Sequence, residues 1–293
     1  MSRLLIIDGH AYAYRAFHAI RDLRSPGGQP TNAIYGFLKM LEKMRQAVAP
    51  THLMVVWDGG LSAERMAALP GYKAQRPEMP DDLRSQLDEI GKYLAAAGVP
   101  DYCADGIEAD DYIGCLARRA AAAGWNVVIA SSDKDFMQLV TAQVGLLNPN
   151  DKTGTIWGRE QVRAKSGVEP EQVADWLALM GDAVDNIPGV PGVGVKTAAS
   201  LLQEFGSVED LYGRLSEVKS EKLKTSLLAA AETVRLNQRL VRLHEVPCEL
   251  QSEKLMARAA DREKLRGLYR GWGFKGLLAE LEAQLPERQV ELI

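Results

Sequence analysis

The chain has 293 residues, of which 46% are hydrophobic and 25% are charged, as in an ordinary soluble globular protein of one large or two medium domains. The net charge of −4 excludes a surface that is basic throughout, as many nucleic-acid-binding proteins have. No apolar run approaches the roughly 18 residues that a membrane span needs, so no membrane association is expected.

The cysteines and the first residues predict where the protein works. Cys103, Cys115 and Cys248 have the spacing of neither a metal knuckle nor a disulfide framework, which favours a reducing, cytoplasmic setting. Asp8 interrupts the first apolar run after a few residues, so no signal peptide is expected.

Two short apolar runs each end in an aspartate that is followed by glycine. Residues 4–7 end at Asp8, residues 52–57 end at Asp58, and a helical pattern over 31–48 lies between them. Two buried strands joined by a helix predict a doubly wound α/β sheet, in which ligands bind outside the carboxyl ends of the strands. For either aspartate alone, an ordinary Asp-Gly turn is the alternative explanation.

Residues 61–80 interrupt this alternation with a segment rich in proline, glycine and charge, which predicts a mobile excursion before a helix over 81–97. Within it, Tyr72 lies next to Lys73 and close to Arg76. A base or sugar could rest on the aromatic ring while the cations meet phosphate. The alternative is a solvated loop.

The segment 103–114 concentrates negative charge, because Glu108, Asp110 and Asp111 occupy three of four consecutive positions before a helix that is expected to end near residue 123. Close carboxylates raise one another's pKa unless a cation sits between them. The alternative is a solvated acidic cap at a helix N-terminus, where some negative charge is favourable.

Carboxylates recur at two further places. A strand over 125–130 runs into Asp133 and Asp135, and a helix over 170–180 runs into Asp182 and Asp185. A fourth strand is expected over 144–147, and 157–167 is expected to be a connection near a domain boundary. Without the clustered acids the basic residues outnumber the acidic ones, which suits a metal-dependent nuclease with an acidic pocket in a mildly basic body.

Three glycines and two prolines within residues 188–194 predict a tight hairpin before a helix over 200–205. Its backbone amides would lie near a helix N-terminus, where phosphate binds readily, and Lys196 adds a charge. An ordinary helical hairpin remains the alternative, and the spacing is not that of a nucleotide P-loop. Amphipathic helical runs follow over 216–243 and 257–284.

These motifs, in this order, resemble the 5'-3' exonuclease domains of bacterial DNA polymerases I, within the flap endonuclease family. The resemblance covers nearly the whole chain. It rests on the following segments: Ile7–His10, Tyr14–His18, Asp58, Glu108–Asp111, Asp133–Asp135, Gly181–Gly189 and the glycine hairpin with Lys196.

The resemblance implies an α/β fold with a PIN-like, doubly wound, mostly parallel sheet. It implies a nuclease core over 1–166 with a helical arch region at about 61–90. A helical DNA-binding part over 167–293 would carry a helix-two-turn-helix at about 181–206. The implied activity is structure-specific 5' nuclease action, both 5'-3' exonuclease and 5'-flap endonuclease, on DNA in replication and repair.

The resemblance also implies two Mg²⁺ or Mn²⁺ ions per active site and a K⁺ ion at the hairpin 189–197. The residues that match the family's ligands of the first ion are Asp8, Asp58, Glu108 and Asp110, and Asp111 lies close by and is counted with the metal residues. Those that match the ligands of the second are Asp133, Asp135, Asp182 and Asp185.

Further roles follow from the same resemblance. Lys73, Arg76 and Asp110 are expected to act in catalysis. Branched, flapped or nicked DNA is the expected partner of a monomeric protein, with a DNA polymerase as a functional partner. The expected DNA contacts are Arg15, Tyr72, Lys73, Arg76, Gly192, Gly194 and Lys196.

The chain departs from the family pattern in two segments. After Asp58 the family usually continues with Ala and later a Phe-Arg pair, whereas residues 59–65 here are Gly-Gly-Leu-Ser-Ala-Glu-Arg, which affects expected substrate contacts before Tyr72. Val195 stands where Pro often precedes the hairpin lysine. The sequence ends at Ile293 without a polymerase domain, which fits either a free-standing nuclease or an excised domain.

Three rival functions make different demands. A non-catalytic binder of branched DNA would lack some of the carboxylates, and all nine are present. A PIN-type ribonuclease would not need the helix-two-turn-helix, which favours duplex DNA. A phosphatase with an aspartyl nucleophile would need Asp-x-Asp after the first strand, where His10 stands instead.

Overall fold

A six-stranded sheet with the order β3-β2-β1-β4-β5-β6 forms the centre of the computed structural model, which describes residues 2–151 and 153–283. All neighbouring pairs are parallel except β5 with β6, so the predicted doubly wound, mostly parallel sheet is confirmed. The strands are β1 (Arg3–Asp8), β2 (His52–Val56), β3 (Asp101–Tyr102), β4 (Asn126–Ala130), β5 (Val144–Leu147) and β6 (Ile156–Trp157).

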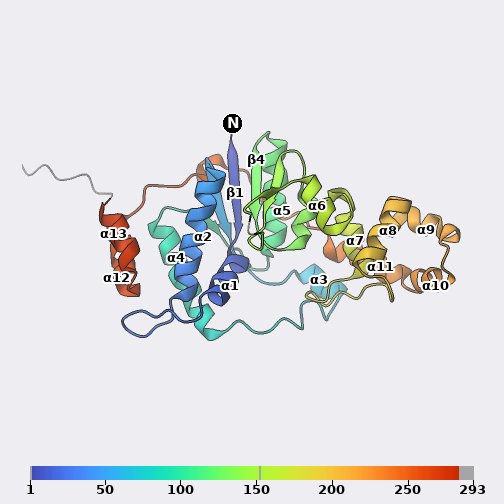
Figure 1. The fold of residues 1–293 in the computed structure, drawn as a ribbon, viewed down its shortest axis with the longest axis horizontal. Coiled ribbons are helices and arrows are strands. Elements are labelled where there is room, and N and C mark those ends of the chain that lie inside the picture. The colour runs from blue at the N-terminus through green and yellow to red at the C-terminus, as the bar shows by residue number, and fades with distance from the viewer. Residues whose placement is uncertain (1, 152, 284–293) are drawn as a thin grey trace, which may run out of the picture.

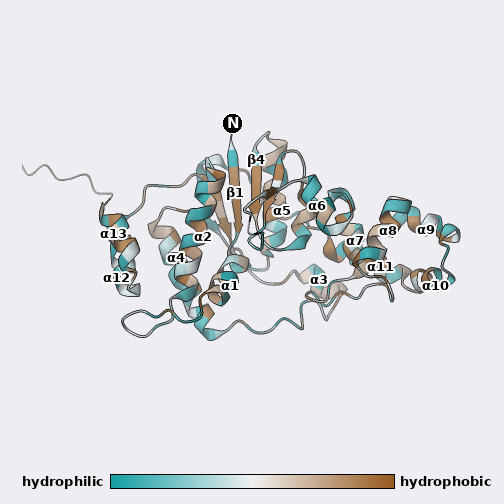
Figure 2. Ribbon diagram, viewed as in Figure 1, coloured by the Kyte–Doolittle hydropathy of each residue, from teal (hydrophilic) through white to brown (hydrophobic). Residues whose placement is uncertain are grey.

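Both faces of the sheet are covered, which explains why the central strands are apolar without alternation. Leu5 and Ile7 belong to a core with helices α1 (Gly9–Ala19), α2 (Asn32–Val48) and α4 (Asp81–Ala96). Leu4 and Ile6 belong to the opposite core, with α5 (Ala109–Ala122) and α7 (Val173–Met180). Figure 2 shows the strands as brown, apolar ribbons between helices of mixed colour.

A helical part extends from one side of the sheet, at the right of Figure 1. In it α7 packs against both α8 and α11. Its elements are α6 (Arg159–Ser166), η2 (Pro170–Gln172), α7, α8 (Val195–Phe205), α9 (Val208–Gly213), η3 (Leu215–Glu217), α10 (Glu221–Ala229) and α11 (Ala231–Val241).

The chain then returns past the sheet to the opposite end of the molecule (Figure 1). The short η4 (Ser252–Leu255) contacts β2 on the way, and α12 (Arg262–Trp272) packs on α4 and on α13 (Lys275–Ala283). The Trp272 indole donates a hydrogen bond to Glu89 at 2.9 Å, which joins α12 to α4. No described helix is long and apolar enough to span a membrane.

Several predicted element boundaries were wrong. Residues 157–167 form the end of β6 and helix α6 instead of a connection, and the helix expected over 200–205 begins at Val195. The run 216–243 is divided into η3, α10 and α11, and the run 257–284 begins its helix only at Arg262. Gln284 and the residues after it lie outside the described part of the chain.

The segment 61–80 contains a short helix, α3 (Ala63–Ala68), which was predicted only as an excursion. Ser62 caps this helix, because its side chain accepts a hydrogen bond from the Arg65 amide. A sequence pattern of two turns is too short to give a helical periodicity, so this helix depends on its cap and its tertiary contacts.

Two close backbone approaches require glycine and shape the loops at the carboxyl edge of the sheet. A Cβ at Gly59 would lie 1.9 Å from the carbonyl oxygen of Ala104, so the loop after β2 packs directly on the loop before α5. A Cβ at Gly181, which has φ +74°, would lie 2.4 Å from the amide of Gly189. These approaches bring loops that carry predicted site residues together.

Candidate active site

The carboxyl ends of the central strands open into an acidic cavity of about 430 Å³. Lys73, Arg76 and Lys134 supply positive charge in its wall, and His10 and Tyr14 complete one side. Six of the nine predicted ligands line it: Asp8, Asp58, Asp110, Asp133, Asp182 and Asp185. Segments from the first strand to residue 185 therefore converge at one place, as the motif order predicted.

The first two carboxylates follow β1 and β2. Asp8 caps α1, since its side chain accepts hydrogen bonds from the Ala11 amide at 3.0 Å and from the Ser131 hydroxyl at 2.8 Å. The Asp58 amide donates to Nδ1 of His10 at 3.1 Å, which holds the loops after the two strands together. His10 and Ser131 are thus neighbours of the predicted ligands that sequence spacing did not single out.

The N-terminus of α5 provides the next group. Glu108 is the N-cap residue and is buried, and Asp110 accepts a hydrogen bond from the Asp111 amide at 2.7 Å. Glu108 does not line the cavity. Its side chain instead accepts hydrogen bonds from Lys73 and from the Ser62 amide, the latter at 2.9 Å.

Asp133 and Asp135 stand after β4, at the start of η1 (Lys134–Leu139). Asp133 lines the cavity and accepts a hydrogen bond from the Asp135 amide at 2.9 Å. Asp135 is buried, and its Oδ1 has no hydrogen-bond partner among the described residues. A buried carboxylate oxygen without a donor is costly unless a proton or a cation satisfies it.

Asp182 and Asp185 belong to a tight loop after α7, closed by a bridge between Asp182 and Ile187. Asp182 pairs with Lys134 at 3.1 Å, and Asp185 pairs with Arg76 at 2.7 Å. This loop also holds the segment after α3, because the Lys73 amide donates to the carbonyl of Asp185 at 3.0 Å. The predicted second ligand group therefore lies beside the predicted arch region.

Tyr72 does not have the exposed ring that its predicted stacking on DNA requires. It is 2% exposed, and its hydroxyl donates to Glu108 at 3.2 Å, with Asp185 at 3.5 Å. The ammonium of Lys73 lies 4.8 Å from the centre of its ring. Tyr72 is therefore buried beside two of the predicted ligands and contacts both through its hydroxyl.

Asp111 also differs from its predicted role. Both of its oxygens accept hydrogen bonds from the guanidinium of Arg65, at 2.7 and 2.8 Å, and it does not line the cavity. The prediction that Asp111 is a metal ligand does not fit this pairing. The sequence did not predict a partner for Arg65, because nothing in a linear sequence shows which carboxylate an arginine will meet.

The remaining predicted DNA contacts are distributed over the surface. Arg15 bonds to Asn150 and does not line the acidic cavity. Gly192 (φ +82°), Gly194 and Lys196 are exposed at the hairpin and at the first turn of α8. The indole of Trp176 fixes this turn by donating to the carbonyl of Val195 at 3.1 Å. The amide-rich turn is therefore presented to solvent, as a phosphate contact requires.

Burial and mutual repulsion shift the pKa values of these carboxyl groups. Burial raises the pKa of Asp8, Asp133 and Asp135, and neighbouring carboxylates add to the rise. Burial raises the pKa of Asp110 to about 7, with a further contribution from Glu108 and an opposing one from Lys73. A cluster that holds protons this firmly is a cluster that would also attract cations.

Lys73 and Glu108 shift each other's pKa values. Burial alone lowers the pKa of the Lys73 ammonium, but Asp110 and Glu108 outweigh it and raise the pKa above its ordinary value. Burial likewise raises the pKa of Glu108, and the charge of Lys73 brings it below its ordinary value. Lys73 and Glu108 therefore form a charged pair at neutral pH.

The donor set fits a hard divalent cation, although side chains would have to turn to hold one. Among residues 2–151 and 153–283, no three Asp, Glu, His or Cys side chains stand ready to hold an ion as placed. Glu108, Asp182 and Asp185 are paired with cations instead. Oxygen-only donors, the unpartnered Asp135 Oδ1 and the raised carboxyl pKa values suit a divalent cation.

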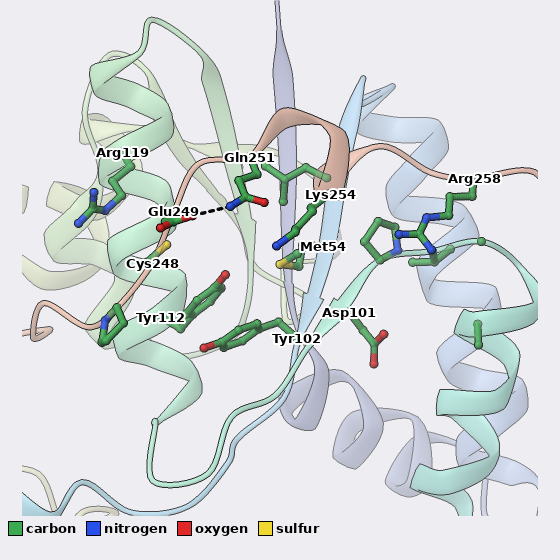
Figure 3. A pocket seen from close by; sticks show the side chains of 16 residues that line it. Met54, Asp101, Tyr102, Tyr112, Arg119, Cys248, Glu249, Gln251, Lys254 and Arg258 are labelled. Carbon is green, nitrogen blue, oxygen red and sulfur yellow. Dashed lines mark hydrogen bonds between the residues drawn. The ribbon is translucent and has the colours of Figure 1, made fainter.

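A second cavity, of about 790 Å³, lies at the β3 edge of the sheet under residues 247–258 (Figure 3). Tyr102 and Tyr112 stack in it with ring centres 3.6 Å apart, and Lys254 points into it. None of the predicted ligands or DNA contacts lines this cavity, so it is separate from the acidic site.

Two protein-family descriptions match consecutive parts of the chain. "5'-3' exonuclease, N-terminal resolvase-like domain" matches residues 3–167, and "5'-3' exonuclease, C-terminal SAM fold" matches residues 168–263. The first contains the sheet and most of the acidic cavity, and the second contains Asp182, Asp185 and the hairpin.

Individual relatives agree with these matches. A 5'-3' exonuclease of Aquifex aeolicus is 40% identical over 284 residues, which cover 96% of each chain. DNA polymerase I of Pseudomonas aeruginosa is 41% identical over 97% of this chain, which spans only 32% of that longer protein. A structure of T5 5'-exonuclease with bound zinc is similar in fold, with a TM-score of 0.69 and 27% identity over 82% of this chain and 89% of the other.

Proposed function

This chain belongs to the 5'-3' exonuclease family, and from that premise we propose that it is a metal-dependent 5' nuclease that hydrolyses DNA phosphodiesters at 5' ends and 5' flaps. The single observation that carries the proposal is the convergence of six carboxylates and three cationic side chains in one cavity at the carboxyl edge of the sheet. Bound zinc in the related T5 5'-exonuclease supports metal dependence.

We propose that two divalent ions are held there. Asp8, Asp58, Glu108 and Asp110 would hold the first, and Asp133, Asp135, Asp182 and Asp185 would hold the second. Two such ions supply an activated water and stabilise the leaving 3' oxygen. Asp111 is left out of this set because Arg65 takes both of its oxygens.

The chain's own cations then act on the phosphate. Lys73 and Arg76 line the cavity and are paired with Glu108 and Asp185. If those carboxylates held an ion, the two cations would lose their present partners and would be available to the phosphodiester. Fixed positive charge of this kind stabilises the negative charge that develops on phosphate oxygens in the transition state. The product would carry a 5' phosphate.

Substrate choice would come from the helical part. The exposed hairpin at 189–197 and Lys196 would follow the backbone of the duplex, with a K⁺ ion held by main-chain oxygens there. The scissile nucleotide would have to unpair to reach the carboxylates. The meeting of the two family matches at residues 167 and 168 supports a division into a core over 1–166 and a helical part from 167. A DNA polymerase would be its functional partner.

The test is Asp110→Ala, assayed with a 5'-labelled flap, a nicked duplex and a blunt duplex in Mg²⁺. Asp110 lines the cavity and belongs to the proposed first metal group, so cleavage should fall by about 10³-fold or more. Chelation of the wild type should abolish turnover and leave DNA binding measurable. Near-wild-type cleavage by the variant would refute the assignment, and faster cleavage of matched RNA would favour the ribonuclease instead.

A further inference from the structure

Arg65 is the least expected residue of the molecule, because it is a charged side chain in a short helix and is only 2% exposed. All three nitrogens of its guanidinium donate hydrogen bonds. The two terminal nitrogens donate to both oxygens of Asp111, at 2.7 and 2.8 Å. Nε donates to the carbonyl of Leu240 at 3.0 Å, and Nη2 donates to that of Arg242 at 3.0 Å. Nη1 also lies 3.3 Å from Glu108 Oε2.

These contacts join three parts of the chain that are far apart in sequence. Arg65 belongs to α3 at the start of the predicted arch region, and Asp111 and Glu108 belong to the N-terminus of α5. Leu240 and Arg242 lie at the end of α11, where backbone carbonyls lack partners within the helix. We call this group of contacts, made by Arg65 with Asp111, Glu108 and the carbonyls of Leu240 and Arg242, the joint. Asp111 strengthens it by accepting a further hydrogen bond from the His244 amide, at 2.7 Å.

We propose that Arg65 is a positioning residue for Glu108, and that it fixes this carboxylate relative to both the arch segment and the end of α11. The inference rests on the proposed metal-dependent function, because it assigns Glu108 to the first ion. Arg65 would act through Glu108 and Asp111 without touching DNA or an ion. Helix α11 would thereby be held in a set relation to the catalytic carboxylates.

The geometry explains why this position needs arginine. A buried cation is stable only if it is paired and fully hydrogen-bonded, and the planar fork of arginine can meet a carboxylate bidentately while it reaches two carbonyls. A lysine keeps the charge and supplies a single nitrogen, so it cannot serve Asp111, Leu240 and Arg242 together. Glu108 would then keep its contacts with Lys73, Tyr72 and the Ser62 amide and lose its link through Arg65 to the end of α11.

The test compares Arg65→Lys with the wild type at a temperature where circular dichroism shows both to be folded. Manganese affinity without DNA, measured by titration calorimetry, should fall about tenfold, as is usual when a side chain that orients a metal ligand is lost. In flap cleavage, kcat should fall by a similar factor and be restored by excess Mn²⁺. KM for DNA should change little, because Arg65 is buried and none of its hydrogen bonds reaches the hairpin residues Gly192, Gly194 or Lys196.

A matched control tests whether manganese affinity depends on the position of Glu108 or only on the loss of a nearby positive charge. Arg242→Ala removes an exposed arginine from the same joint and leaves its backbone carbonyl in place, so manganese affinity should stay at the wild-type value. If Arg65→Lys does not fold, Asp111→Asn removes half of the bidentate pairing with a smaller change and should show the same loss of affinity and the same rescue by Mn²⁺.

Two results would overturn the inference. One is unchanged manganese affinity in a folded Arg65→Lys or Asp111→Asn protein. The other is a loss of activity that excess Mn²⁺ does not restore, since that would show a purely structural role. Failure of the wild type to bind Mn²⁺ or to cleave flaps would instead defeat the proposed function, so the two failures can be told apart.

Discussion

Asp110 shows at the scale of one residue how the site conflicts with the stability of the metal-free protein. Its carboxyl group is surrounded by Glu108 and Asp111, and burial raises its pKa to about 7, against 3.8 for an ordinary aspartate. At a pH between these two pKa values, this group binds more protons in the folded protein than in the unfolded chain. The free energy of unfolding contributed by this group therefore falls as pH rises from about 4 to 7.

Asp110→Asn removes this titration and should alter the pH dependence of stability. In EDTA, the wild type should lose more stability than the variant between about pH 5 and pH 7.5. The variant should be the more stable protein at the upper end, by about 1 to 3 kcal/mol. Urea unfolding at each pH measures both. Parallel curves for the two proteins would contradict the raised pKa.

Tyr72 and Asp111 show the limit of reading residues one at a time. Each matched a motif, and each was expected to face the reaction, yet Tyr72 is buried and Asp111 is held by Arg65. Which side of a loop faces the cavity depends on how other segments pack against it. The sequence identifies the chemistry of a side chain, and the packed loop decides whether that chemistry is exposed.

At the scale of elements, the loops after the strands position the site residues more directly than the strands do. The loop after β2 lies directly on the loop before α5, with hydrogen bonds from the Gly59 amide to Ile107 and from the Gly106 amide to Gly59. This contact brings the Asp58 and Glu108 loops together. Gly59 is therefore the residue that this approach requires.

Gly59→Ala should destabilise the protein by about 1 to 3 kcal/mol, because the new Cβ would lie 1.9 Å from the Ala104 carbonyl oxygen and force the loops apart. Gly91→Ala is the matched control. Nothing lies within 4 Å of its Cβ position inside α4, so the same change should stabilise by about 0.5 to 1 kcal/mol. Denaturant unfolding of both variants gives the comparison, and equal effects would contradict the close approach.

At the scale of the whole molecule, the surface that would meet DNA and the cavity that would cut it belong to different parts. The hairpin with Lys196 begins α8 in the helical part, and the carboxylates lie at the sheet. The joint made by Arg65, Asp111 and the end of α11 connects the two. Helices α12 and α13 lie at the far end, away from both, where α12 packs on α4 and on α13 (Figure 1).

Lys196→Ala should therefore weaken DNA binding without changing the chemistry. Anisotropy titrations with a flap in EDTA should show a loss of affinity for every sequence, and the slope of log affinity against log salt should fall by about one. The single-turnover rate at saturating DNA should stay at the wild-type value. Lys275→Ala, in α13 at the opposite end, should change neither quantity. A changed rate with unchanged affinity would contradict the separation.

The sequence by itself determined the central fold and the chemistry of the site. Apolar runs that end in aspartates predict buried parallel strands with carboxylates at one edge, because the carboxyl ends of such strands must meet. The order of five acidic motifs was specific enough to indicate the family, which the comparisons then confirmed. These features are local in the sequence, so spacing and residue type are sufficient to read them.

Only the tertiary structure decided which carboxylates face the cavity and which are bound by cations. The partners of Arg65 lie about 45 to 180 residues away along the chain. Helix α6 and the break between α10 and α11 were likewise not predicted from the sequence pattern. The physical reason is the same in each case: burial, ion pairing and close backbone approach depend on contacts between distant segments, and a linear sequence does not show which segments will meet.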